Sequence, residues 1–112
     1  MMYRLERWRS VIEPIIQNSI APAPWEYIVQ QNIVLFDRPE SVLLCMVSDW
    51  KGKKSLHITV AAGKMDEVNE MYLEAEEYAR QHDCKTIIYV GRTGWLKTHG
   101  FKNEAVIGCK EL

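Results

Sequence analysis

Glycine, arginine and threonine gather in one turn near the end of the chain, residues 91–95 (GRTGW). A predicted strand precedes this turn and a short predicted helix follows it. Glycines, a cation and a helix N-terminus together can bind a phosphate group. The turn lacks, however, the Lys-Ser/Thr pair of a P-loop and the glycine spacing of a dinucleotide fingerprint. We therefore expect a strand-to-helix turn with Trp95 in the core, and Arg92 as its one candidate ligand contact.

Histidine supplies a candidate general base. His57 lies in a predicted strand, where it shares one face with Thr59 and Ala61, and that face could line an open cleft. A half-buried histidine is more often structural than catalytic. The three histidines and three cysteines show no zinc-type spacing, so no metal site is expected.

The composition is that of one ordinary globular domain, residues 1–112, with 47% hydrophobic and 26% charged residues. The apolar runs are too short to span a bilayer and no secretory leader is apparent, so no membrane association is expected. A net charge of −1 argues against a nucleic-acid partner. Three widely spaced cysteines in or beside apolar segments are typical of buried thiols in an intracellular, cytoplasmic protein.

Hydrophobic periodicity and turn residues predict nine elements. A helix over residues 3–20 should be kinked or divided at Pro14, and Asp66 should be the N-cap of the long helix. The predicted segments are helices 3–20 and 25–31, strands 33–36, 41–50 and 55–62, helix 66–84, strand 85–90, helix 94–99 and strand 101–110. This order predicts an α/β (α+β) fold with a mixed, mostly antiparallel sheet and helices on both faces.

The element order resembles that of the GNAT acyl-CoA N-acyltransferases. Residues 56–90 resemble the acetyl-CoA-binding core of that family, and residues 96–101 (LKTHGF) resemble its closing helix and Gly-Phe exit. The resemblance implies a three-layer sandwich and, for an active member, acetyl transfer from acetyl-CoA to an amine. The first strand of the family is missing, and its seventh strand is not apparent.

Two departures from the family pattern concern the chemistry. Where the family has a glycine-rich pyrophosphate loop, residues 61–68 (AAGKMDEV) keep only Gly63, and carboxylates at the start of the helix would repel a diphosphate. The position of the usual tyrosine proton donor is Leu96. If the chain is active, the resemblance leaves Tyr89 and His57 as catalytic candidates. Acetyl-CoA would then be held by Gly63, Lys64 and Arg92.

The segments 90–93 (VGRT) and 96–100 (LKTHG) resemble short, degenerate GNAT-like proteins of tailed phages and prophages. That resemblance implies a non-catalytic protein without a cofactor, acting in head assembly or as an internal virion component. Its location would be the host cytoplasm or the virion.

Uneven charge and several tryptophans predict a protein partner or self-association. Residues 66–77 (DEVNEMYLEAEE) hold six acidic and no basic side chains, which also suits a plain solvated helix face. Trp25 and Trp50 are candidate interface anchors. A missing first strand would also leave a sheet edge to be covered, for example by a second copy.

Overall fold

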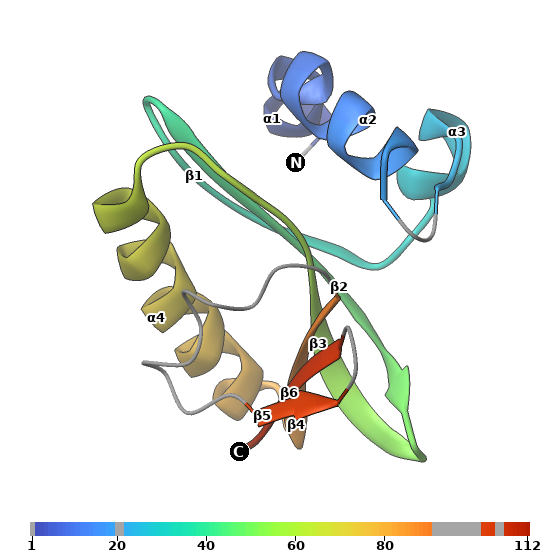
Figure 1. The fold of residues 1–112 in the computed structure, drawn as a ribbon, viewed down its shortest axis with the longest axis vertical. Helices are drawn as coiled ribbons and strands as arrows, with labels where there is room; N and C mark the ends of the chain where they lie inside the picture. Colours follow the sequence, from blue (N-terminus) through green and yellow to red (C-terminus); the bar gives the residue numbers. More distant parts are fainter. Residues whose placement is uncertain (1, 20–21, 91–101, 105–106) are drawn as a thin grey trace.

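A mixed sheet organises the chain, with the strand order β1-β2-β3-β4-β6-β5. The computed structural model describes residues 2–19, 22–90, 102–104 and 107–112 (Figure 1). Its helices are α1 (Met2–Arg7), α2 (Arg9–Gln17), α3 (Trp25–Ile28) and α4 (Met65–Gln81). Its strands are β1 (Ile33–Arg38), β2 (Ser41–Trp50), β3 (Lys53–Ala62), β4 (Thr86–Val90), β5 (Lys102–Glu104) and β6 (Ile107–Glu111).

Four of the strand pairs are antiparallel, and only β3 and β4 run parallel among the described strands. Two-residue turns close the β1–β2 and β2–β3 hairpins, and α4 provides the crossover that a parallel β3–β4 pair requires. The prediction of a mixed, mostly antiparallel sheet in a small α+β domain is confirmed.

Each face of the sheet carries its own core, and helices cover both (Figure 1). Side chains alternate between faces along β2, so neighbouring residues enter different cores. The α4-side core consists of Leu43, Cys45, Leu56, Ile58, Val68, Met71, Tyr72, Ala75, Ala79, Cys84 and Ile87. The N-terminal-side core, under α1–α3, consists of Leu5, Trp8, Ile12, Ile16, Trp25, Ile28, Leu35, Val42, Leu44 and Val60.

A bulge in β3 changes which side chains face α4. The register pairs Leu44 with Val60 and Cys45 with Ile58, which leaves Thr59 as an extra residue. Before the bulge Ile58 points into the α4-side core, whereas after it Ala61 does. The prediction that His57 and Ala61 share a face is therefore wrong, because the extra residue reverses the alternation.

Three predicted details of the elements are wrong. The N-terminal helix breaks at Trp8 and not at Pro14, which lies inside α2. The N-cap of α4 is Lys64, and Asp66 lies within its first turn. The single predicted strand 101–110 is two strands, β5 and β6, which pair antiparallel. The predicted helix 94–99 lies outside the described residues.

Trp25 is only 5% exposed, so the prediction that it anchors an interface is wrong. Its ring packs among the side chains of the N-terminal-side core, and its Nε1 donates to Glu6 Oε1 at 3.2 Å. Trp50 is half-buried at the end of β2.

Candidate functional site

The predicted cofactor loop joins β3 to α4 and packs against the β1–β2 turn. Gly63 has a φ of +119°, a conformation that glycine adopts without strain. A Cβ at this position would lie 2.5 Å from the Glu40 carbonyl oxygen and from the Cα of Ser41. The glycine is therefore required by a close approach of two backbone segments, and this approach accounts for it without a phosphate.

Lys64 is already engaged within the chain. Its backbone N–H donates to Ser41 Oγ at 2.9 Å, and its Nζ lies 2.5 Å from Glu40 Oε2. The Ser41 hydroxyl in turn donates to Glu67 Oε1 at 2.5 Å. Ser41 thus connects the β1–β2 hairpin to the first turn of α4, and the carboxylates of Glu40 and Glu67 lie beside the loop that would receive a diphosphate.

The two candidate catalytic side chains lie on opposite faces of the sheet. Tyr89 packs against the α4-side core, whereas His57 alternates with Leu56 and Ile58 of that core and points to the other face. Burial lowers the pKa of His57, which keeps the ring neutral at pH 7. None of the described residues hydrogen-bonds to its ring. Because the sheet separates His57 from Tyr89, the two cannot act on one substrate atom.

The remaining candidates, Arg92 and the position of the usual proton donor at Leu96, lie outside the described residues. So does the whole 91–95 turn with Trp95. Cys45 and Cys84 are free and buried, and burial raises the pKa of each thiol, so neither is a reactive thiolate.

A buried carboxylate on α4 does not stand out in the sequence, where the acidic run reads as one surface. Glu76 is 8% exposed, and its Oε2 accepts hydrogen bonds from Tyr72 Oη at 2.6 Å and from Lys110 Nζ at 2.9 Å. Its Oε1 accepts one from Arg80 Nη2 at 2.6 Å. The signal that could have found it is the spacing, because Tyr72, Glu76 and Arg80 follow one another at intervals of four on a single helix face.

Burial opposes ionisation of Glu76, but the hydrogen bonds from Tyr72, Lys110 and Arg80 outweigh it and lower its pKa to about 2. Burial and the hydrogen bond to Glu76 also raise the pKa of Tyr72. With both carboxylate oxygens bonded to donors, this group anchors β6 to α4 and is not arranged to transfer a proton to a substrate.

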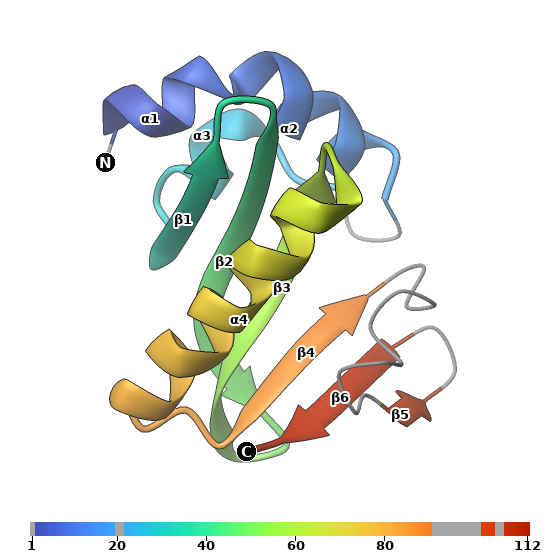
Figure 2. The ribbon, with the colours of Figure 1, turned by 90° about the vertical axis from the view of Figure 1, so that its left-hand side faces the viewer.

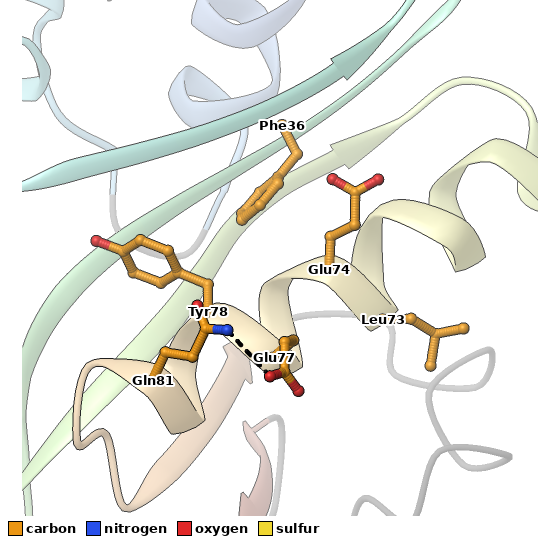
Figure 3. Close-up of a pocket in the computed structure, with 6 residues that line it drawn as sticks. All are labelled: Phe36, Leu73, Glu74, Glu77, Tyr78 and Gln81. Carbon is orange, nitrogen blue, oxygen red and sulfur yellow. Dashed lines mark hydrogen bonds between the residues drawn. The ribbon is translucent and has the colours of Figure 1, made fainter.

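A shallow, open groove of about 490 Å³ lies on the exposed surface of α4, and Phe36 of β1 borders it (Figure 3). Its apolar lining comes from Phe36, Leu73 and Tyr78, and its polar lining from Glu74, Glu77 and Gln81. The Phe36 and Tyr78 rings meet edge to face, with centroids 6.3 Å apart. Leu73 is 59% exposed and points away from Phe36 (Figure 3).

Neither a metal centre nor a membrane-spanning helix is found in the described residues. No group of three or more His, Cys, Asp or Glu side chains there could hold a metal ion. In the same part of the chain, no helix has both the length and the apolar character needed to cross a membrane. No model of a known protein family matches the chain, and no curated protein is similar to it in sequence.

Proposed function

We propose that the chain is a non-catalytic protein with a GNAT-like three-layer fold that acts through protein contacts, as an assembly or internal component of a phage head. The fold part of the proposal is supported by the β2–β3 hairpin, which leads into α4, and by β4, which returns parallel to β3. This strand–helix–strand unit is the one on which the resemblance rests. The phage part rests on the short segments 90–93 and 96–100 alone.

The observation that carries the loss of catalysis is the occupied loop at the start of α4. Lys64, the one cation of the loop, pairs with Glu40, and its N–H is taken by Ser41. A diphosphate would have to displace both contacts and approach the carboxylates of Glu40, Asp66 and Glu67. The negative charges of these carboxylates would repel a diphosphate. Residues 61–68 also lack the second glycine that would let a phosphate approach the backbone.

A small N-acetyltransferase remains the second candidate, because two observations favour it. The β3–β4 ladder ends at the pair Ile58–Tyr89, so β3 continues to Ala62 without a described partner on that side. No side chain among the described residues caps the N-terminus of α4 from its N-cap position, Lys64. Diverging strands beside uncapped helix amides would suit a nucleotide cofactor.

Calorimetric titration with acetyl-CoA and CoA separates the two functions. We expect no saturable heat up to millimolar cofactor. The control is the double variant Asp66→Asn/Glu67→Gln, which removes two negative charges from the first turn of α4. Micromolar binding to the unmodified chain that Lys64→Ala weakens would overturn the proposal and establish a cofactor site.

The assembly role needs a separate measurement. Mass spectrometry of purified heads from a producing host should detect the chain in a fixed ratio to the major head protein if it is an internal component. If it acts only during assembly, it should be found in precursor heads and be missing from mature ones. Its absence from both would contradict the assembly role and leave the fold unaffected.

A further inference from the structure

The outer edge of β1 has backbone groups that point away from the sheet. β1 is the end strand of the sheet on this side, and its C-terminal end lies beside the N-terminal helices (Figure 2). The Val47 N–H donates to the Asn32 carbonyl at 2.9 Å, so residues 33, 35 and 37 direct their N–H and C=O groups away from β2. An edge of this kind pairs with further strands unless it is protected.

Two arginines occupy the outward carbonyls of this edge. Arg4 Nη2, on α1, donates to the Leu35 carbonyl at 3.1 Å, and Arg38 Nη1 donates to the Asp37 carbonyl at 3.1 Å. Both guanidinium groups are themselves held in place. Arg4 Nη2 lies 2.7 Å from Asp37 Oδ1, and Arg38 pairs with two glutamates of α4. The two carbonyls are therefore hydrogen-bonded without a second strand.

Antiparallel pairing of two β1 edges about a two-fold axis would need these same carbonyls. With Leu35 opposite its counterpart in a second copy, these two residues would exchange N–H···O bonds. Ile33 would exchange bonds with Asp37 of that copy. While both arginines are in place, only the bonds that end on the Ile33 carbonyl could form. The arginines thus oppose pairing at the centre of the edge.

The contact of Arg4 can open while α1 stays packed on the sheet. The Arg4 side chain is 47% exposed, whereas the nearby Leu5 and Trp8 are buried in the N-terminal-side core. Trp8 Nε1 donates to Asp37 Oδ2 at 3.0 Å and would keep this carboxylate in place. Release of one guanidinium therefore uncovers the Leu35 carbonyl and leaves the helix and the strand where they are.

We propose that Arg4 and Arg38 protect the edge of β1 from self-pairing, and that release of Arg4 turns this edge into a surface that pairs with β1 of a second copy. The contact of Arg4 with β1 is then an autoinhibitory one. The inference concerns the association of the chain with itself, so it goes beyond the function proposed above and does not depend on it.

The test compares the full-length variants Arg4→Met and Arg9→Met by sedimentation velocity over a range of concentrations. Methionine keeps an aliphatic stem but has no donor, so Arg4→Met loses the contact with the Leu35 carbonyl and retains packing. It should self-associate at least roughly tenfold more tightly than the unmodified chain, because the bonds to the Leu35 carbonyls become available. Arg9→Met is the matched control and should not change association, because Arg9 is 43% exposed and pairs with Glu13 within α2.

Hydrogen exchange identifies the surface that pairs. In the unmodified chain the outward amides of Ile33 and Leu35 should exchange faster than those of Val34 and Phe36, which face β2. In the associated form of Arg4→Met, the Ile33 and Leu35 amides should become protected, because they then donate to the second copy.

Arg38→Met is a second test that leaves α1 unchanged. It uncovers the Asp37 carbonyl and should also promote association, in about 0.5 M salt, which screens the glutamates of α4 that lose their partner. Ile33→Pro in either background removes an outward N–H and no bond to β2. Association should then return to the level of the unmodified chain.

Folded Arg4→Met and Arg38→Met that associate no more tightly than Arg9→Met would overturn the inference. So would association that survives Ile33→Pro, since the contact would then lie elsewhere on the molecule. Equal protection of the Ile33 and Leu35 amides in the unmodified chain and in Arg4→Met would overturn it as well, because the arginines would then not oppose pairing.

Discussion

The Glu76 carboxylate accepts hydrogen bonds from three donors on its two oxygens. Its neighbours in sequence, Glu74 and Glu77, are exposed on the same helix. The difference follows from the helical period, because Glu76 lies on the same side of α4 as the buried Tyr72 and Ala79. One acidic run therefore supplies both an internal anchor and a solvated surface.

Replacing Glu76 with glutamine should destabilise the protein by about 2–3 kcal/mol at neutral pH, because hydrogen bonds to a charged acceptor are lost. Glutamine has a similar shape, so the loss isolates the charge. Urea unfolding of both proteins measures the difference. Glu77→Gln is the matched control and should change the stability by less than about 0.5 kcal/mol, because that side chain is exposed.

The stability difference between the original protein and Glu76→Gln should depend on pH, and the pKa of Glu76 fixes its sign. The pKa of Glu76 falls from an ordinary value of 4.5 to about 2 in the folded protein, so the unfolded chain binds more protons between these values. The stabilisation by Glu76 is complete above this window and is lost as the pH falls through it. Unfolding experiments near a pH of about 3 should therefore show a smaller gap between the original protein and Glu76→Gln. A gap that does not change with pH would contradict this ionisation.

Gly63 should tolerate alanine poorly. The substitution places a Cβ against Glu40 and Ser41 at a positive φ, and it should cost about 3 kcal/mol from strain and overpacking together. Gly52, at a φ of +78° and with open space within 4 Å of where a Cβ would lie, is the control and should lose about 1 kcal/mol. Thermal unfolding of the two variants compares them directly. Equal losses would mean that the loop moves away from the hairpin.

At the scale of the elements, α2 contains a proline, Pro14, that removes one hydrogen bond from the interior of the helix. Pro14 is exposed and has no N–H to donate within the helix. Pro14→Ala should stabilise the protein by about 1 kcal/mol, since a new bond to the Ser10 carbonyl outweighs the greater freedom of the unfolded chain. Chemical denaturation measures the change.

Pro24 provides the opposite case. It precedes α3 with a φ of −69°, the value that its ring imposes, so Pro24→Ala should destabilise by a few tenths of a kcal/mol. A loss of stability in Pro14→Ala would show that the ring of Pro14 makes contacts that the helix geometry does not reveal.

Strand positions were predictable because alternation and apolar runs are local signals. β2 was predicted with its observed bounds, Ser41–Trp50. The break at Trp8 was not, because that side chain is held by Asp37, a residue far along the chain. The bulge at Thr59 also depends on pairing with β2, which no local pattern of β3 encodes.

The candidate site was predictable only in part, for the same reason. The acidic start of α4 and the single glycine of its loop could be read directly from the sequence. The contact of Gly63 with the β1–β2 turn and the hydrogen bond from Ser41 to Glu67 join segments more than twenty residues apart. Such contacts come from the tertiary fold, so the sequence alone could not predict them.

For the whole molecule, the two cores share one set of strands. On β2, Leu43 contributes to the α4-side core and Leu44 to the N-terminal-side core. Loss of either set of helices would expose one face of β2 and weaken the packing of the other. The described residues should therefore behave as a single cooperative unit even though their cores lie on opposite faces.

This coupling predicts one unfolding transition seen by every probe. Tryptophan fluorescence includes Trp8 and Trp25 of the N-terminal-side core, whereas far-UV circular dichroism is weighted toward α4, the longest described helix. The two signals should coincide in urea. Ile12→Ala in one core and Met71→Ala in the other, both at fully buried positions, should each move both signals together by about 2–5 kcal/mol. If Ile12→Ala shifted only the fluorescence transition, α1–α3 would be a separate unit that unfolds before the sheet, and the edge of β1 held by Arg4 would open with it.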